Sequence, residues 1–294
     1  MKKILVTGAK GFLGRNIVKN LKDDNDVTGC GRTMPEDTDI YRYVHWNICD
    51  GYEPVKLLGE DFDVIIHAAA SLDKNNLSEE LIKTNIEGTF NVMRFAIEHS
   101  VKTVIYISGL PIIGDTHQVP ITENIAINPG TLYHATKAAG ESIINQCRHY
   151  GIRVVVLRVP SPIGPDMPNN TIVPILIQHA LKGEDIQIWG KGTRKQNYLD
   201  IRDCANAIKL ILENELVDGV YNIGAKNIVS NYELATTIIK LLKSNSRITL
   251  SGEDSSDLVD WTTDDSKLRK LIGEYQQFSI SQSISDIANE MKKA

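Results

Sequence analysis

The first twenty-one residues constrain the fold of this chain more than any other stretch. A short apolar segment at residues 3–6 leads into the sequence Thr-Gly-Ala-Lys-Gly-Phe-Leu-Gly at positions 7–14. Apolar residues then recur at helical spacing as far as Leu21. This order predicts a strand, a tight turn and a helix that packs back against the strand.

The three glycines of this turn have separate roles. One glycine can adopt the positive φ that a tight turn requires. Another lets the backbone lie against a pyrophosphate, and the third lets helix and strand pack closely. The first N–H groups of the helix then face the anion, and the helix dipole favours its negative charge. The turn therefore predicts a dinucleotide site formed by Gly8, Lys10, Gly11, Phe12, Leu13 and Gly14.

The composition is that of a globular enzyme and argues against several other classes. Of the 294 residues, 42% are hydrophobic and 23% charged, and the net charge is −5 without a long run of one sign. We therefore expect no nucleic-acid surface, no membrane anchor and no membrane span. Too few apolar residues follow Met-Lys-Lys for a signal peptide. The four scattered cysteines favour reduced thiols in a cytoplasmic protein over disulfides or a metal site.

Strand and helix patterns alternate through the first half of the chain. Strands are expected at residues 26–30, 43–46, 63–67, 103–108 and 153–157. Helices are expected at residues 77–100 and 131–150. Alternation of this kind predicts an α/β fold of the Rossmann type, a doubly wound parallel sheet with helices on both faces and right-handed crossovers.

The pattern changes after residue 158, where five prolines fall within residues 160–174. Further helices are expected at 172–182, 202–212, 230–242 and 280–291, with short strands at 186–189 and 220–223. Ser230 and Glu233 have the spacing of a capping box. We expect residues 1–158 to form a dinucleotide-binding domain and residues 159–294 mainly a smaller α/β substrate lobe, part of which returns to the first domain.

The residues after two predicted strands bear on the choice of cofactor. An acidic residue at the end of the second strand would hold a ribose 2′-hydroxyl, but this chain has Gly31 followed by Arg32. A guanidinium can bind a 2′-phosphate bidentately, and Lys10 offers a second cation. The sequence thus favours NADP over NAD, although Arg32 could be only an exposed loop charge. Asn47 and Ile48 follow the next strand, where they could bracket an adenine ring.

Tyr133 and Lys137 lie four residues apart in a predicted helix, so their side chains share one face. Tyrosine, with an ordinary pKa of about 10, is a poor acid–base catalyst near neutral pH. A nearby ammonium and the positive charge of an oxidised nicotinamide favour the phenolate. The lysine can also hold the nicotinamide ribose. Tyr-x-x-x-Lys occurs by chance in many proteins, but its place after the fifth predicted strand indicates proton transfer.

Together these features resemble the extended short-chain dehydrogenase/reductase family, which contains nucleotide-sugar epimerases, dehydratases and 4-keto reductases. The glycine turn has the spacing Gly-x-x-Gly-x-x-Gly that is typical of that superfamily, and the match extends through 64–70, 129–141, 158–165, 190–203 and 219–224. The resemblance implies a nucleotide-sugar substrate and a homodimer formed through the helices at 77–100 and 131–150. It also places six further residues at the cofactor: Ala68, Ala69, Ala70, Asn85, Pro160 and Ile163.

Three positions depart from the family pattern. The usual catalytic Ser or Thr position is Gly109, so the nearest hydroxyl is that of Ser108, which an extended strand would turn to the opposite face. The family asparagine near the substrate phosphates falls at Ser161, and the family arginine falls at Gln196, with Arg194 close by. We assign Ser161, Arg194 and Gln196 to substrate binding. We assign Ser108, Tyr133 and Lys137 to catalysis.

The leading interpretation is an NAD(P)-dependent enzyme acting on a nucleotide-linked sugar, with a 4-keto-sugar reductase favoured. A 4-epimerase with tightly held NAD is the alternative. A dehydratase is less favoured, because those enzymes usually carry an acidic pair where this chain has Leu110 and Pro111. A rival from another class is a dinucleotide-binding sensor that has lost catalysis, which Gly109 favours and the Tyr133–Lys137 pair argues against.

Overall fold

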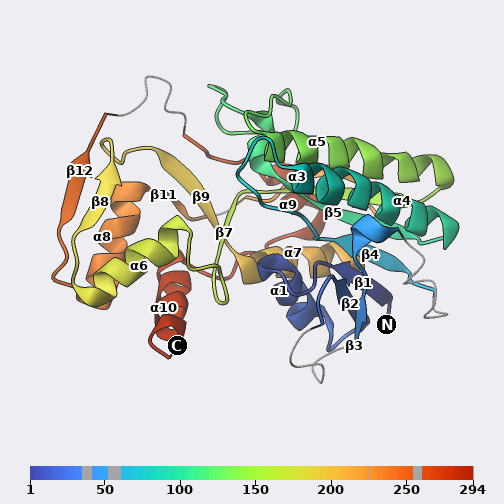
Figure 1. Ribbon diagram of the computed structural model, residues 1–294, viewed down its shortest axis with the longest axis horizontal. Helices are drawn as coiled ribbons and strands as arrows, with labels where there is room; N and C mark the ends of the chain where they lie inside the picture. Colours follow the sequence, from blue (N-terminus) through green and yellow to red (C-terminus); the bar gives the residue numbers. More distant parts are fainter. Residues whose placement is uncertain (35–41, 52–60, 225, 254–259, 294) are drawn as a thin grey trace.

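Seven parallel strands form the central sheet of the larger lobe (Figure 1). The computed structural model describes residues 1–34, 42–51, 61–224, 226–253 and 260–293. The strand order is β10-β6-β5-β4-β1-β2-β3. Successive strands are added on one side of β1 up to β3 and then on its other side from β4 onward, as in a doubly wound fold. The strands are β1 (Lys3–Thr7), β2 (Asp26–Gly31), β3 (Arg42–His45), β4 (Val64–His67), β5 (Thr103–Gly109), β6 (Arg153–Val159) and β10 (Gly219–Asn222).

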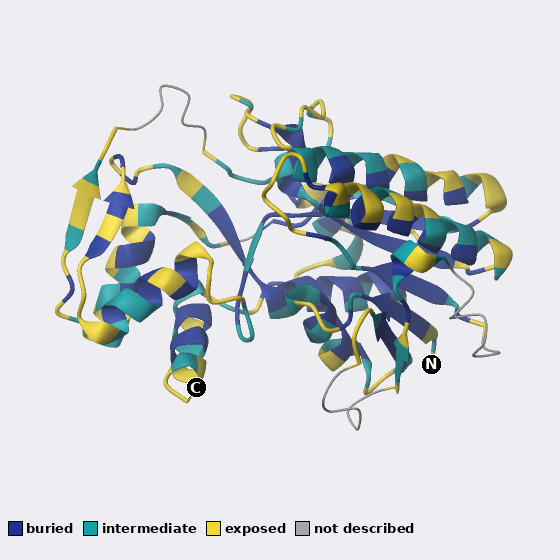
Figure 2. Cartoon of the chain, in the orientation of Figure 1, coloured by how far each residue is buried: buried dark blue, intermediate teal, exposed yellow. Residues whose placement is uncertain are grey.

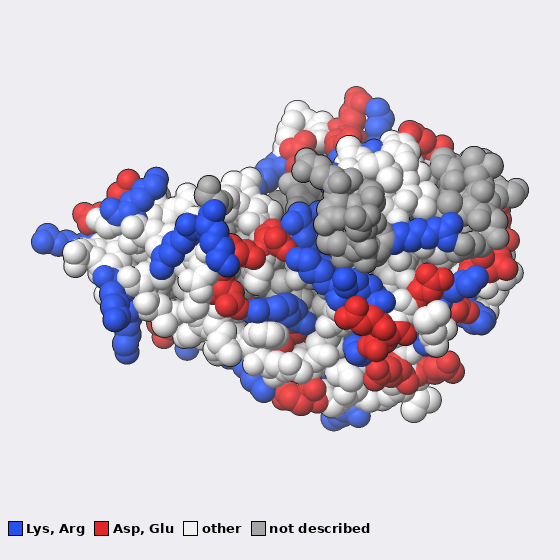
Figure 3. Space-filling model, turned by 90° about the horizontal axis from the view of Figure 1, so that it is seen from below, with Lys and Arg blue, Asp and Glu red and all other residues white. Residues whose placement is uncertain are grey.

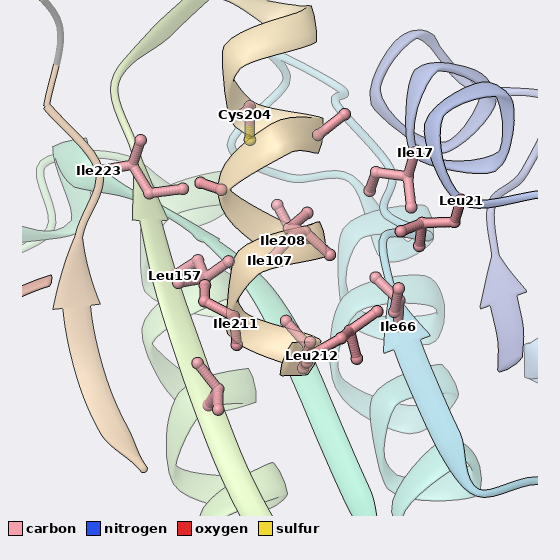
Figure 4. Packing of buried hydrophobic residues seen from close by; sticks show 14 of the residues in the cluster. Ile17, Leu21, Ile66, Ile107, Leu157, Cys204, Ile208, Ile211, Leu212 and Ile223 are labelled. Carbon is pink, nitrogen blue, oxygen red and sulfur yellow. The ribbon is translucent and has the colours of Figure 1, made fainter. Parts of the chain in front are cut away.

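Helices cover both faces of this sheet, which is why its inner strands are almost continuously apolar. One face carries α1 (Phe12–Leu21), α7 (Ile201–Glu213) and α9 (Ser266–Ile272). Figure 4 shows Ile17 of α1 and Ile208 of α7 pointing toward Ile107 and Leu157 of the sheet. The other face carries α3 (Glu79–Ile82), α4 (Gly88–Glu98) and α5 (Leu132–Asn145). The Rossmann-type doubly wound sheet expected from the sequence is confirmed.

Besides α9, strand β10 and helix α7 of the later chain belong to this larger lobe. Strand β10 pairs with β6, so that Val220 lies opposite Val156. Helix α7 buries its apolar side against α1 and the sheet. Part of the chain after residue 158 therefore packs with the strands of the larger lobe. The division at residue 158 itself stays a prediction.

The smaller lobe has a core of its own, visible in Figure 2 as buried positions on the inner sides of three helices. These helices are α6 (Ile172–Lys182), α8 (Asn231–Leu242) and α10 (Ile280–Met291). Strands β8 (Ile186–Trp189) and β12 (Ile248–Ser251) pair in parallel, and β7 (Ser161–Ile163), β9 (Lys195–Asp200) and β11 (Ile228–Ser230) form a three-stranded sheet. The expected capping box is present, with Ser230 and Glu233 bonding each other's backbone N–H.

The single helix expected at residues 77–100 is interrupted. Helix α3 begins at Glu79 and ends at Ile82, a π-helical turn spans Lys83–Glu87, and α4 continues to Glu98. The wide turn places Asn85 toward the preceding loop, where its side chain bonds both backbone groups of Ser71. Hydrogen bonds to a neighbouring loop thus favour a π turn that an apolar periodicity does not predict.

The surface mixes charges of both signs. On the face seen from below, basic and acidic side chains are interspersed (Figure 3), in keeping with the small net charge. Within the residues described by the structure, no helix has the length and apolar content needed to cross a bilayer.

Candidate active site

The glycine turn joins β1 to α1 in the predicted way. Gly8 has a φ of +69°, which an L side chain rarely adopts, and a methyl group at Gly14 would collide with the Gly8 carbonyl. Gly11 is the N-cap of α1 and has no side chain to cap the helix. The first turn, Phe-Leu-Gly-Arg, contains no acidic residue. Its N–H groups are therefore suited to an anionic group, and the turn fits a pyrophosphate.

A cavity of about 360 Å³ lies beside this turn. Nine of the predicted cofactor residues line it: Gly8, Lys10, Gly11, Arg32, Asn47, Ile48, Ala68, Ala69 and Ala70. The sequence analysis missed four other lining residues: Thr33, Tyr43, Trp46 and Thr84. Thr33, Tyr43 and Trp46 belong to no motif and come to the turn through the order of β2 and β3 in the sheet, whereas Thr84 comes from the π-helical turn at Lys83–Glu87. The cavity fits the adenosine half of a dinucleotide.

The cationic side chains of Lys10 and Arg32 lie near the end of β2, where Tyr43 leaves no room for a side chain at Gly31. The Lys10 ammonium donates to Thr33 Oγ1 (3.2 Å) and to the Met34 carbonyl (3.0 Å), which draws the side chain toward Arg32. A Cβ at Gly31 would lie 2.5 Å from the Tyr43 hydroxyl. The position of the missing ribose-binding carboxylate is thus partly filled by a phenol. Arg32 Nη1 bonds a Glu80 carboxylate oxygen at 2.7 Å.

A second cavity, of about 400 Å³, continues from the first and shares Gly11, Ala68 and Ala70 with it. Its lining includes most of the remaining predicted residues: Phe12, Leu13, Gly14, Ser108, Tyr133, Lys137, Pro160 and Ser161. A third cavity, of about 220 Å³, shares Pro160 and Ser161 with the second and adds Arg194 and Gln196. His134, Asn197 and Trp261 also line the third cavity and were not predicted. Because neighbouring cavities share these lining residues, they adjoin along the carboxyl ends of the strands, and we refer to the three together as the channel.

Helix α5 positions the Tyr133–Lys137 pair. Thr131 is its N-cap and accepts a hydrogen bond from the backbone N–H of His134 (3.2 Å), so Tyr133 stands in the first turn. Lys137 follows one turn later on the same side, and both residues line the second cavity. Burial raises the pKa of Tyr133 to about 12, so the phenol holds its proton at neutral pH. This shift opposes the phenolate that the sequence analysis expected.

Lys137 is nearly inaccessible, with 4% of its surface exposed. Burial lowers the pKa of its ammonium to about 7, and the nearby Glu141 carboxylate acts in the opposite direction. Glu141 is itself held by Arg158, whose guanidinium donates to both carboxylate oxygens at 3.1 and 2.9 Å. The Lys137 ammonium lies 4.2 Å from the centroid of the Tyr106 ring, a cation–π contact.

Near Lys137, the buried ring of His67 is held by hydrogen bonds at both of its nitrogens. His67 Nδ1 bonds Thr7 Oγ1 at 2.7 Å, and Nε2 bonds Thr89 Oγ1 at 3.0 Å. Burial and the neighbouring Lys137 lower the pKa of His67 to about 3, so the ring is neutral. Thr7 Oγ1 also accepts the N–H of Ala69 (3.2 Å). The network ties the ends of β1 and β4 to the loop that lines both cavities.

Residues 4–224 match the model of the family described as NAD dependent epimerase/dehydratase, which is well over half of the chain. The chain belongs to this family. It is therefore an extended short-chain dehydrogenase/reductase, as the motifs of the sequence indicated.

Relatives and solved structures agree with this membership. The chain is 29% identical to a dTDP-glucose 4,6-dehydratase of Neisseria meningitidis, over 83% of this chain and 76% of that protein. It is 28% identical to the low-salt glycan biosynthesis protein Agl12 of Haloferax volcanii, over 81% of each. A UDP-glucuronic acid 4-epimerase from Bacillus cereus, solved with UDP-glucuronic acid and NAD, shares the fold with a TM-score of 0.88 and 23% identity over 99% of each chain. A UDP-glucose 4-epimerase from Thermotoga maritima also superposes with a TM-score of 0.88, at 22% identity over 99% of this chain and 98% of that one.

The Ser/Thr position of this epimerase/dehydratase family is open in the present chain. Gly109 has extended backbone angles, φ −123° and ψ 139°, and an added Cβ would lie 3.6 Å from Pro111 Cδ. A serine would therefore fit. Ser108 is 3% exposed, and among the described residues its hydroxyl has no hydrogen-bond partner. Its side chain lies on the same face of β5 as Tyr106, and Ser108 lines the second cavity.

Two residues assigned to the cofactor lie outside the channel. Asn85 is buried and bonds Ser71 and the Thr136 hydroxyl, thereby tying the loop after β4 to α5. Ile163 is 1% exposed and packs in the core of the smaller lobe, because the third residue of β7 faces α6. Asn85 can act on the cofactor site only by supporting it, and Ile163 supports the neighbouring lobe.

Proposed function

We propose that this family member is an NADP-dependent reductase of a nucleotide-linked 4-keto sugar. One observation carries the proposal. Tyr133 and Lys137 line the middle of a channel that begins at the glycine turn and ends at Arg194 and Gln196. A dinucleotide and a sugar nucleotide entering from opposite ends would meet at the tyrosine.

The residues of the channel supply the proton and the positioning. A bound NADPH would supply the hydride that reduces the ketone carbon. Tyr133, neutral at pH 7, donates its phenolic proton to the carbonyl oxygen as that oxygen gains charge. Lys137 stabilises the resulting phenolate and is suited to holding the nicotinamide ribose. Either Ser108, after a local movement, or a water beside Gly109 would complete the hydrogen bonds to the reacting oxygen.

The third cavity supports a phosphorylated substrate. Arg194 brings a guanidinium to it, and Gln196 and Ser161 bring neutral polar groups. Trp261 stands beside Arg194, whose guanidinium carbon lies 5.6 Å from its ring centroid, and offers an aromatic surface. The UDP-sugars named with the solved relatives have a diphosphate of the kind these groups would bind.

The residues around Arg32, and the pair Leu110 and Pro111, bear on whether the enzyme is a reductase, an epimerase or a dehydratase. Arg32 and Lys10, with Tyr43 against Gly31, support NADP and therefore a reductase that exchanges its cofactor. Leu110 and Pro111 replace the acidic pair that a dehydratase would use. A 4-epimerase remains the second candidate, because the Glu80 carboxylate beside Arg32 brings a negative charge toward the adenosine end and so favours NAD.

Assembly and location complete the proposal. We propose a homodimer joined through α3, α4 and α5, where Ile82 of α3 and Phe90 of α4 are exposed (37% and 46%). Light scattering at micromolar protein should show a dimer, and Phe90→Glu should shift it toward monomer; a monomeric wild type would contradict the assignment. All four cysteines are free thiols, which supports a location in the reducing cytoplasm.

One experiment separates the candidates. Purified protein is incubated with NADPH or NADH and with nucleotide-linked 4-keto sugars, and absorbance at 340 nm is followed. The reductase proposal expects substrate-dependent NADPH oxidation. Interconversion of UDP-sugars without net cofactor turnover would indicate the epimerase instead. Dinucleotide binding without turnover on any sugar nucleotide would favour the sensor that Gly109 suggests.

A further inference from the structure

An ion pair links two distant segments at the adenosine end of the channel. Arg32 follows β2, and Glu80 lies in α3, forty-eight residues later in the chain. Arg32 Nη1 and a Glu80 carboxylate oxygen are 2.7 Å apart, and both side chains are substantially exposed, at 64% and 44%. Exposed pairs of this kind contribute little to stability. The pair is therefore easily opened by a ligand that offers Arg32 a better anion.

The Glu80 carboxylate is held in this place by a second bond. The same oxygen that accepts from Arg32 accepts the hydroxyl of Thr84 at 3.1 Å. Thr84 and Arg32 both line the adenosine cavity. The carboxylate thus stays at the rim of the cavity whether or not Arg32 is engaged elsewhere.

The Glu80 carboxylate lies close to the end of β2, where the chain has Gly31 in place of an acidic residue. Gly31 stands where an acid would contact the ribose 2′-hydroxyl, and Tyr43 obstructs a side chain there. Glu80 brings a carboxylate to the neighbouring Arg32 from a different element. A 2′-phosphate bound by Arg32 would have to displace this carboxylate and would then lie near its negative charge.

We infer that Glu80 is a specificity-determining residue that competes with the 2′-phosphate of NADP for Arg32. The inference rests on the proposed dinucleotide site and concerns its selectivity. Glu80 lowers the affinity of the protein for NADP and leaves its affinity for NAD nearly unchanged. It therefore reduces the preference for NADP over NAD that Arg32 and Lys10 create. Salt screens exposed charges, so the selectivity should depend on ionic strength.

Equilibrium binding of NADP and NAD to the whole protein tests this competition without any sugar substrate. Isothermal titration calorimetry on Glu80→Gln should show NADP binding about three- to tenfold tighter than in the wild type, with NAD changed less than twofold. The matched control is Glu79→Gln, which removes the same charge from the same helix. Glu79 is 87% exposed and pairs with Lys83 at 3.6 Å, not with Arg32. This control should leave both affinities within twofold of the wild type.

The Arg32→Ala background distinguishes competition from long-range charge. Because Glu80 acts by occupying Arg32, Glu80→Gln should gain much less NADP affinity when Arg32 is absent. A full-size gain in that background, or equal effects of Glu80→Gln and Glu79→Gln, would overturn the inference while leaving the dinucleotide site intact. If the wild type binds neither NADP nor NAD, the proposed function fails as well.

Discussion

The Tyr106 ring lies directly beside the Lys137 ammonium, 4.2 Å from centroid to nitrogen, and the Tyr106 hydroxyl donates to the Lys137 carbonyl at 3.3 Å. One aromatic side chain of β5 thus holds both the charge and the backbone of the lysine. A methyl group on Gly140, one turn further along α5, would collide with the same hydroxyl. Helix α5 and strand β5 therefore approach each other closely at this point.

This relationship predicts a split between two variants of Tyr106. Tyr106→Phe keeps the ring and should retain turnover within about threefold. Tyr106→Leu loses the cation–π contact, worth about 0.5–2 kcal/mol, so the pKa of Lys137 should fall and the alkaline limb of the kcat profile should move to lower pH. The pH dependence of kcat for both variants measures this. A Leu variant that loses stability but keeps the wild-type pH profile would show that Tyr106 only packs.

Removal of the Tyr133 hydroxyl tests proton transfer directly. Tyr133→Phe keeps the ring and should lower turnover by about 10²–10⁴-fold, with dinucleotide affinity changed less than twofold. Lys137→Ala should lower both turnover and affinity, because the lysine serves the tyrosine and the ribose. The double variant should lose much less than the product of the two single effects, since the residues act together. Full activity of Tyr133→Phe on a verified substrate would refute the mechanism.

Arg32→Ala should weaken NADP binding much more than NAD binding. The expected loss is about 1–3 kcal/mol for hydrogen bonds between charged groups, moderated here by exposure to solvent. Titration of both dinucleotides by calorimetry provides the comparison, and Arg94→Ala on the outer side of α4 serves as a control for loss of positive charge. Equal losses for NADP and NAD would contradict an NADP site at Arg32.

Gly109→Ser should be tolerated and should leave turnover unchanged or raise it. The backbone at this position is extended, and the nearest atom to a new Cβ is Pro111 Cδ at 3.6 Å, an ordinary contact. The added hydroxyl would supply the group that the family places beside the reacting oxygen. Steady-state kinetics gives the effect, and a thermal melt checks the fold. A large fall in kcat with an unchanged melting temperature would show that the site needs the space left by glycine.

The buried lysine predicts a pH-dependent stability. The pKa of Lys137 is about 7 in the folded protein against about 10.5 in an unfolded chain. Between these values the unfolded chain binds more protons, so the contribution of Lys137 to the free energy of unfolding becomes more favourable as pH rises. Lys137→Met should therefore stabilise the protein at pH 6–7, by on the order of 1–3 kcal/mol, and the gain should shrink toward pH 10. Chemical denaturation across this range measures it, with exposed Lys182→Met as control.

The sequence predicted the parts of the fold that rest on local patterns. The glycine turn, the apolar strands β1, β4, β5 and β6 and the capping box at Ser230 were each found where expected. Strands β7, β9, β11 and β12 were missed, because they are short or lack a clear apolar alternation and take their conformation from pairing with distant partners. The π turn at Lys83–Glu87 was missed for a similar reason, since the bonds that favour it go to another loop.

In the candidate site too, the residues of local motifs were predicted and those brought in by the tertiary fold were missed. Motif residues such as Gly8, Tyr133 and Lys137 were predicted and line one channel. Glu80 and Trp261 were missed, because only the tertiary fold brings them to Arg32 and Arg194. Burial reversed the expected direction of the Tyr133 pKa, an effect that composition and spacing cannot convey.

The late return of β10 has a consequence for how this protein is made. A ribosome must complete residue 222 before the last strand of the central sheet exists, although β6 ends at Val159. Until then the growing chain carries an unpaired strand edge and an apolar α1 surface that α7 will later cover. A shortened chain ending near residue 158 would retain both. The larger lobe is thus complete only after the chain has passed through β7, α6, β8 and β9 of the smaller lobe.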